Sequence, residues 1–458
     1  MRTPATIDQL QTVIGGRLIT PGDSDYDALR RVGADVDRRP ALIARVADAG
    51  DIGAVIAYAR EAALPLAVRS GGHSAAGHGV VDGGVVIDLR DLRDLEIDVA
   101  GRTAWVETGL TAGEYTAAAD ADGLATGFGD TGSVGIGGIT LGGGIGYLVR
   151  AHGLTIDSLL AAEIVTADGA LLRTDAQTHP DLFWAIRGGG GNFGVATRFQ
   201  FRLHELGQVV GGMLVLPATA DTVAGFMAAA DSAPDSLSTI ANVMNCPPMP
   251  FVPEEHHGQV VILAMLCHIG TTEAGQAAVA PFRDLATPIA DMVRPIAYAE
   301  MYPPEDPDYH PTATARTLFM DHVDRSAAET IVQRLEASDA SLRVVQLRAL
   351  GGAAARVPVE ATAYAHRQSK VLVSVAAFYE GPDDRVVREA WVADLAGALR
   401  QADGGAYVNF LADEGDARVR AAYPGATWDR LRAIKTRYDP TNLFQGNQNI
   451  PPASWSDR

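Results

Sequence analysis

Cysteine is scarce in this 458-residue sequence, which contains only Cys246 and Cys267. Two cysteines are too few for a disulfide framework, and their spacing matches no metal-binding motif. Free cysteines are usually buried small apolar residues, so we expect two ordinary buried thiols and no metal site.

Basic residues and long apolar runs are also in short supply. The chain has 37 Lys and Arg against 56 Asp and Glu, a formal net charge of -19, which argues against nucleic acid or an anionic membrane surface as the main partner. The longest clean apolar run, residues 260–267, is far too short to span a bilayer. No basic stretch followed by an apolar run opens the sequence, so we expect a cytoplasmic protein without a membrane partner.

Glycine, in contrast, is abundant: 49 residues, gathered in clusters at 70–79, 127–146 and 188–194. Glycine lets backbone N–H groups approach a ligand closely, and consecutive N–H groups in a turn form a concavity that binds phosphate. One cluster alone would indicate a loose turn. Three clusters near predicted strands favour one extended nucleotide cofactor held by several loops.

The cluster at 188–194 contains a known dinucleotide-binding sequence pattern. Gly189, Gly191 and Gly194 satisfy the G-x-G-x-x-G pattern of dinucleotide-binding folds. That pattern requires a strand before it and a helix after it, whereas here a predicted helix (180–187) precedes and a predicted strand (195–203) follows. Because no G-x-x-x-x-G-K-[ST] motif occurs either, the phosphate site must belong to another fold.

The periodicity of apolar residues predicts an α+β protein with a change of organisation near residue 207. In the first part, strands are predicted at 66–69, 85–89, 104–108, 161–167 and 195–203, and helices at 51–63, 111–122 and 180–187. In the second part, strands are predicted at 210–216, 259–267, 342–350 and 370–378, and helices at 219–231, 271–284, 325–336 and 384–402. This alternation indicates an antiparallel sheet covered by helices on one face. A further helix is predicted at 426–437.

Four motifs occur along the chain in this order: Arg69-Ser-Gly-Gly-His73-Ser, Asp130-Thr-Gly-Ser-Val-Gly-Ile-Gly-Gly-Ile-Thr-Leu-Gly-Gly-Gly-Ile-Gly146, Arg187-Gly-Gly-Gly-Gly-Asn-Phe-Gly-Val195 and Tyr438-Asp-Pro-Thr-Asn-Leu-Phe444. Together they resemble the FAD-linked oxidases of the vanillyl-alcohol oxidase superfamily, and most closely the berberine-bridge-enzyme-like group. The resemblance spans essentially the whole chain. It implies a PCMH-type FAD-binding domain of two subdomains over residues 1–206. It also implies a substrate-binding domain over 207–403 and a C-terminal segment, 404–458, that returns to the FAD domain.

The resemblance implies FAD as the cofactor, linked covalently through His73, since an imidazole nitrogen is nucleophilic enough to add to the 8-methyl position of the flavin. His78 has no linking role in the family, but it lies in the same loop. The other residues that the resemblance places at the cofactor are Arg69, Ser70, Gly71, Gly72, Ser74, Gly77, His78, Thr131, Val134, Gly137, Gly138, Thr140, Leu141, Gly142, Gly143, Gly194, Val195, Asn447 and Asn449.

Two positions in the second motif refine this expectation. Doubly linked members carry a cysteine where this chain has Thr131, so one covalent bond is expected. The family position that gates oxygen is Val134, and valine resembles the oxygen-permissive members. We therefore expect reoxidation by O2 with formation of H2O2.

The catalytic residues are less well defined by the resemblance. The family's Tyr-x-Asn-Tyr stretch reads Tyr407-Val-Asn409-Phe410 here, so the second tyrosine is lost and Tyr407 remains as the candidate base. Gln346 and Arg348 share one face of a predicted strand, where Arg348 would bind an anionic group or a deprotonated substrate if that face looks at the flavin. A polar edge facing solvent is the alternative. Tyr115 and Asn409 complete the substrate-side candidates.

The expected function is the transfer of a hydride from a small organic substrate, such as an alcohol, sugar, amine or secondary metabolite, to FAD. Two alternatives stay open: a dehydrogenase that passes electrons to an acceptor other than oxygen, and a flavin-binding protein without turnover. The sequence names neither the substrate nor the oligomeric state.

Overall fold

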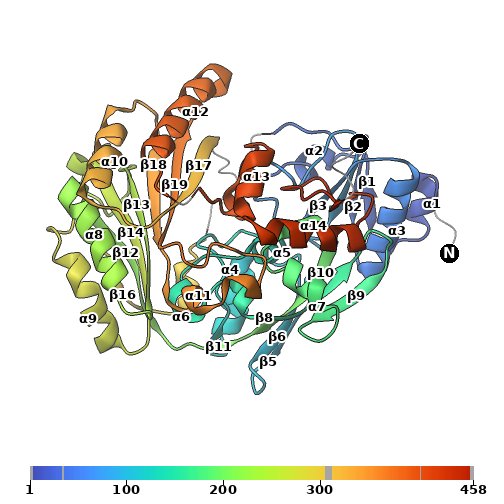
Figure 1. Cartoon of the computed structure of the whole chain (residues 1–458), viewed down its shortest axis with the longest axis horizontal. Coiled ribbons are helices and arrows are strands. Elements are labelled where there is room, and N and C mark those ends of the chain that lie inside the picture. The colour runs from blue at the N-terminus through green and yellow to red at the C-terminus, as the bar shows by residue number, and fades with distance from the viewer. Residues whose placement is uncertain (1–3, 34–35, 305–311, 403, 454–458) are drawn as a thin grey trace.

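The computed structural model describes residues 4–33, 36–304, 312–402 and 404–453. Its strands form a four-stranded, a five-stranded, a two-stranded and an eight-stranded sheet. The first three come from the N-terminal half and the eight-stranded sheet follows in sequence (Figure 1). None of the described helices is long and apolar enough to cross a membrane.

The edge strand β3 of the four-stranded sheet leads into the first glycine-rich loop. Two of its strands pair in parallel with β4, and β1 joins antiparallel at the edge. Helix α3 packs its apolar side on this sheet through Ile52, Val55 and Ile56, and Asp48 caps its first turn. The chain leaves β3 at Arg69 and enters the loop that carries His73. The elements are α1 (Ile7–Gln11), β1 (Arg17–Ile19), α2 (Tyr26–Leu29), β2 (Leu42–Arg45), α3 (Ala49–Glu61), β3 (Leu66–Arg69) and β4 (Val85–Asp88).

The five-stranded sheet is antiparallel, in the order β5-β6-β10-β8-β9. Its core also contains Leu431, Ile434 and Tyr438 from the C-terminal helix α14, so the end of the chain packs back onto the N-terminal half, as Figure 1 shows. The elements are β5 (Leu95–Asp98), β6 (Thr103–Glu107), α4 (Ala112–Asp120), α5 (Ile136–Gly142), α6 (Val149–His152), β8 (Leu159–Val165), β9 (Leu171–Asp175), α7 (Pro180–Ala185), β10 (Val195–Arg202), α13 (Asp416–Ala422) and α14 (Ala426–Tyr438). Strand β7 (Leu124–Ala125) pairs with β11 (His204–Glu205).

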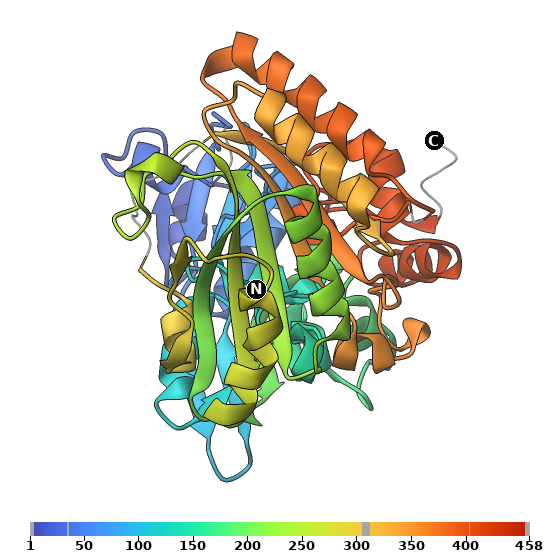
Figure 2. The same ribbon diagram turned by 90° about the vertical axis from the view of Figure 1, so that its left-hand side faces the viewer.

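The eight-stranded sheet is antiparallel throughout, in the order β15-β12-β14-β13-β18-β19-β17, with β16 beside β12. Helices α8, α9, α10 and α12 cover its outer face, and Figure 2 looks onto them. The elements are β12 (Val209–Pro217), α8 (Ala220–Ser232), β13 (Leu237–Asn245), β14 (Val260–Ile269), α9 (Thr272–Arg283), β15 (Ala290–Asp291), β16 (Arg294–Ile296), β17 (Ala313–Met320), α10 (Arg325–Ala337), β18 (Arg343–Ala349), α11 (Gly352–Arg356), β19 (Val371–Phe378) and α12 (Gly381–Ala398).

Side chains alternate along β18 and decide what the inner face of this sheet presents. Val345, Leu347 and Ala349 belong to the apolar core under the helices. Gln346 and Arg348 therefore point to the opposite face, toward the N-terminal half. The expectation of helices on one face only is thereby confirmed, and the polar side chains of β18 are turned inward.

Several elements were not expected from the sequence, and three of them affect the argument. Strands β13 and β17 interrupt the predicted alternation of strands and helices, and helix α5 forms inside the second glycine cluster although glycine disfavours helices by about 1 kcal/mol per residue. Helix α5 is stabilised by burial of Ile136 and Leu141. The proposed domain boundary after residue 206 lies between β11 and β12, and that after 403 falls outside the described residues; both stay predictions.

Candidate active site

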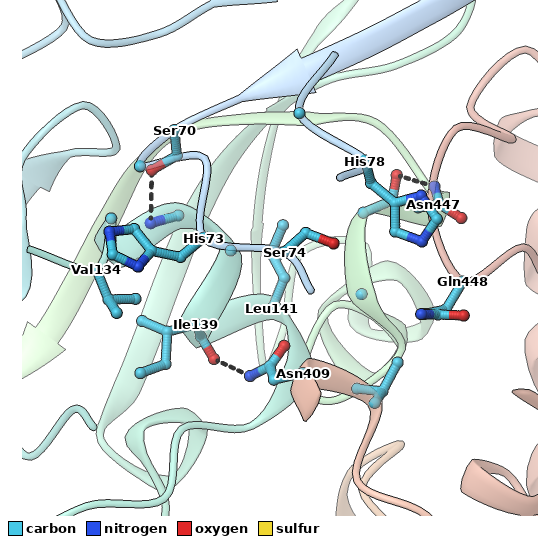
Figure 3. Close-up of a pocket in the computed structure, with 18 of the residues that line it drawn as sticks. Ser70, His73, Ser74, His78, Val134, Ile139, Leu141, Asn409, Asn447 and Gln448 are labelled. Carbon is cyan, nitrogen blue, oxygen red and sulfur yellow. Dashed lines mark hydrogen bonds between the residues drawn. The ribbon is translucent and has the colours of Figure 1, made fainter. Parts of the chain in front are cut away.

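A cavity of about 580 Å³ lies where the glycine-rich loops, the inner face of the eight-stranded sheet and the C-terminal segment meet (Figure 3). Parts of all four sequence motifs line it, together with Gln346 and Arg348 of β18. Segments separated by more than half of the sequence thus line the same cavity. The predicted residues that line it are Ser70, Gly71, Gly72, His73, Ser74, His78, Thr131, Val134, Gly137, Gly138, Leu141, Gly194, Val195, Gln346, Arg348, Tyr407, Asn409 and Asn447.

Two glycine-rich loops touch each other backbone to backbone at the floor of this cavity. A Cβ atom on Gly71 would lie 2.9 Å from the Cα of Gly135, and one on Gly135 would lie 2.8 Å from the Cα of Gly71. Ser70 ties the loops further, because its hydroxyl donates to the carbonyl of Thr108 at 2.6 Å and accepts from the N–H of Gly137 at 3.3 Å. Only glycine permits so close an approach, which leaves a cradle lined by backbone.

His73 and Val134 come from these two loops and both line the cavity (Figure 3). His73 is exposed to it, so its imidazole is accessible to a bound ligand. His78 lines the cavity as well. Burial lowers the pKa of His78 to about 4, with a smaller effect from the charge of Arg38, so this ring is neutral at ordinary pH.

Two buried polar atoms at the cavity have no hydrogen-bond partner among the described residues: Nε2 of His78 and Oδ1 of Asn447. The amide nitrogen of Asn447 is already engaged, since it donates to the carbonyls of Gly191 and Phe444. Buried polar atoms normally have partners. A ligand with polar atoms along this wall would supply them.

The C-terminal loop is held against the glycine-rich loop at 190–192 by a buried ion pair. The ammonium of Lys435 contacts the carboxylate of Asp439 at 2.7 Å and donates to the carbonyls of Asn192 and Phe444 at 2.7 and 2.9 Å. Burial lowers the pKa of Lys435, and the nearby Asp439 opposes that shift. Sequence reasoning missed Lys435, although a lysine four residues before an aspartate on a helix is a recognisable pair.

Tyr407 is buried and is one of the residues that line the cavity. The oxygen accepts hydrogen bonds from the N–H of Gly144 and from Nδ2 of Asn409, each at 2.9 Å. Asn409 is in turn oriented by donating to the carbonyl of Ile139 at 3.0 Å (Figure 3). Burial raises the pKa of Tyr407 to about 12, so the hydroxyl is protonated at neutral pH and its proton is left to be donated.

Arg348 is buried rather than placed on a solvent-facing edge, which decides between the two alternatives for β18. Its guanidinium forms an ion pair with Asp130 at 2.7 Å and donates to Oε1 of Gln346 at 2.8 Å and to the carbonyl of Ile145 at 3.2 Å. The group also lies 5.0 Å from the ring centre of Phe410. The sequence did not identify Asp130 as a site residue, because no sequence pattern links it to Arg348, which lies 218 positions away.

Several candidates lie outside this lining. Tyr115 packs in an aromatic cluster with Phe128 and Phe201, so its expected substrate-side position is wrong. Gly142 packs against the side chain of Asn409, and a Cβ atom on Gly142 would lie 2.8 Å from Nδ2 of Asn409. The predicted cofactor residues that do not line the cavity are Arg69, Gly77, Thr140, Gly142, Gly143 and Asn449. Of these, Gly143 lies beside Tyr364 and Tyr407, and Tyr407 does line the cavity.

Neither cysteine belongs to the site: Cys246 and Cys267 are buried in the eight-stranded sheet region. Within residues 4–33, 36–304, 312–402 and 404–453, no group of three His, Cys, Asp or Glu side chains could hold a metal ion.

Comparison with known proteins agrees with this site. Residues 40–175 match the family model described as FAD binding domain, and residues 406–451 match the model described as Berberine and berberine like. The (R)-6-hydroxynicotine oxidase of Paenarthrobacter nicotinovorans is 29% identical over 96% of this chain and 97% of its own. The uncharacterized FAD-linked oxidoreductase YvdP of Bacillus subtilis is 31% identical over 96% of this chain and 99% of its own.

The crystal structure of 6-hydroxy-D-nicotine oxidase from Arthrobacter nicotinovorans superimposes with a TM-score of 0.85 at 26% identity, covering 98% of this chain and 99% of that one. The predicted α+β fold with a PCMH-type FAD-binding region is confirmed by this likeness. Whole-length relatives, matched family models and the glycine-lined cavity agree: this chain belongs to the berberine-bridge-enzyme-like group and is an FAD-linked oxidoreductase.

Proposed function

We propose that this enzyme is an oxidase that holds FAD through one covalent bond to His73 and oxidises a small organic substrate, with O2 as the final acceptor and H2O2 as the product. The observation that carries the proposal is the meeting of His73, the glycine-rich loops and Tyr407 in the lining of one cavity. The relative named (R)-6-hydroxynicotine oxidase supports assignment as an oxidase.

The residues present suit FAD. Gly71 and Gly135 line the cavity and carry no side chain, and backbone N–H groups in such glycine-rich loops favour a pyrophosphate. The unpartnered atoms of His78 and Asn447 suit the polar groups of a nucleotide. When bound, the isoalloxazine ring of FAD supplies a two-electron acceptor.

The proposal of a single covalent bond is supported by the residues that stand at the family's two linking positions. His73 lines the cavity, Thr131 occupies the position of the second linking residue, and both cysteines lie elsewhere. Forming the bond removes one hydrogen from the imidazole nitrogen and one from the flavin methyl group, and O2 takes the two electrons and both protons. One link is therefore expected, and threonine cannot form the second.

The protein's part in substrate oxidation is to orient the substrate. Tyr407 presents a protonated hydroxyl whose oxygen is held by Gly144 and Asn409, so it would position a bound substrate by donating a hydrogen bond to one of its polar groups. With a pKa near 12, Tyr407 is a poor base at neutral pH. This favours substrates that need no base, such as a neutral amine, which can donate a hydride directly.

Replacement of Val134 by isoleucine tests the role of oxygen. The added methylene should slow the reaction with O2 by roughly tenfold, as one methylene in a tight pocket typically does, and leave turnover with a dye acceptor unchanged. The measurement is O2 consumption and H2O2 formation with a substrate found by screening alcohols, sugars and cyclic amines. Val386→Ile, on the exposed side of α12, is the matched control.

Two other results would redirect the proposal. Turnover of the unaltered enzyme with dye acceptors but without H2O2 would make it a dehydrogenase. A yellow protein whose colour no substrate bleaches would make it a flavin-binding protein without turnover.

A further inference from the structure

The charged side chains in the lining of the cavity balance one another. Apart from the histidines, the described residues of this lining include one cationic and one anionic side chain, Arg348 and Asp130. These two are paired with each other at 2.7 Å. The remaining lining is glycine backbone, apolar side chains, amides and hydroxyls, so no net charge is left over from the pair.

Arg348 is also occupied in every direction that the structure describes. It donates to Asp130, to Gln346 and to the carbonyl of Ile145, and its plane lies over Phe410. Its side chain is only 5% exposed, against 22% for Asp130. Of the two charges, the carboxylate is therefore the more accessible to a molecule in the cavity.

Gln346 is held in the same network. Its Oε1 accepts from Arg348, and its Nε2 donates to Oδ1 of Asn242 on the neighbouring strand β13 at 2.9 Å. Ser374 lies opposite Gln346 on β19 and lines the cavity. The groups left to meet a substrate are thus neutral hydroxyls and amides, together with the exposed part of a carboxylate.

We propose that Asp130 determines specificity by neutralising Arg348, so that the enzyme takes uncharged substrates and rejects those bearing a carboxylate or phosphate. An incoming anion would lose its hydration, meet no unpaired cation and be repelled by Asp130 at low local dielectric. This inference rests on the proposed function and replaces the expectation that Arg348 binds an anionic group.

Binding of small aromatic probes to the flavin-loaded enzyme, followed by the change in the flavin spectrum, tests this. The probes are benzyl alcohol, benzoate and benzylammonium, which share a ring and differ in charge. Asp130→Asn keeps an oxygen that can accept from Arg348 but removes the negative charge, so benzoate should bind at least about tenfold more tightly than to the unaltered enzyme. Benzyl alcohol should change by less than about threefold, and Asp130→Glu should restore rejection of benzoate.

Arg348→Met removes the other charge and provides an independent readout. We expect this variant to gain benzylammonium binding by about tenfold and to bind benzoate more weakly still, because the charge of Asp130 is then left unpaired. Unchanged binding of benzylammonium to flavin-loaded Arg348→Met would show that this pair does not set charge selectivity and would overturn the proposal. The proposal also fails if flavin-loaded Asp130→Asn gains no affinity for benzoate. If Asp130→Asn fails to load flavin, Arg348→Met decides alone.

These outcomes separate this inference from the proposed function. Absence of flavin from the unaltered enzyme, or of turnover with any substrate, would count against the oxidase. Unchanged charge selectivity in variants that retain flavin and turnover would count only against the role of Asp130.

Discussion

Replacing Tyr407 by phenylalanine should lower kcat about 100-fold while flavin content stays at the level of the unaltered enzyme. The hydroxyl is the one donor in the described lining whose oxygen is held in place by two other donors, Gly144 and Asn409. Its loss removes a hydrogen bond to the reacting substrate but leaves the ring and its packing against Phe410. Steady-state kinetics with flavin absorbance recorded on the same sample measures both quantities.

Tyr115→Phe is the matched control for this loss of a hydroxyl. Tyr115 is equally buried, and its hydroxyl contacts Thr126 in the aromatic cluster rather than the cavity. Its kcat should stay within about twofold of the unaltered value, because the group takes no part in the reaction. If Tyr407→Phe kept most of its activity as well, Tyr407 would be a packing residue.

The pH profile gives a second view of the same hydroxyl. Because burial raises the pKa of Tyr407 to about 12, the group stays protonated across the range in which the enzyme can be assayed. A loss of activity on acidification that disappears in Tyr407→Phe would mean that this tyrosine acts as a phenolate, contrary to the role as a donor.

Gly135→Ala should deplete the enzyme of flavin. The backbone at Gly135, with φ -67° and ψ 132°, is open to alanine, so conformational strain is not the obstacle. The obstacle is the methyl group, which would lie 2.8 Å from the Cα of Gly71 and nearer still to its nitrogen. Forcing these loops apart costs about 1–3 kcal/mol, enough to reduce FAD affinity roughly tenfold or more.

The measurement is the ratio of flavin to protein absorbance after purification, together with the melting temperature. Gly397→Ala is the control, because a Cβ at that position of α12 meets nothing within 4 Å. It should retain its full flavin content. A Gly135→Ala variant with a normal flavin ratio would show that the cradle tolerates a side chain and that its closeness is incidental.

The motif-bearing loops could be predicted from the sequence because their chemistry is local. A glycine pair before His73 indicates a close approach of backbone to ligand without knowledge of the rest of the chain. The alternation along β18 likewise placed Gln346 and Arg348 on one face, and burial of the opposite face explains why they point into the cavity.

What the sequence could not supply are contacts between segments distant along the chain. Asp130 meets Arg348 across 218 positions, and Lys435 reaches the carbonyl of Asn192 across 243, with no periodicity to mark either pair. Helix α5 is a different case, since its glycines argue against a helix and tertiary burial of Ile136 and Leu141 stabilises it.

The central claim is tested most directly by the mass of the denatured polypeptide. After acid precipitation and washing, the account predicts a protein heavier by one FAD, with the flavin fluorescence on the peptide that contains His73. His73→Ala should return the mass to that of the amino acids alone while folding normally. A bare polypeptide mass from the unaltered enzyme, with all flavin in the supernatant, would contradict the covalent bond.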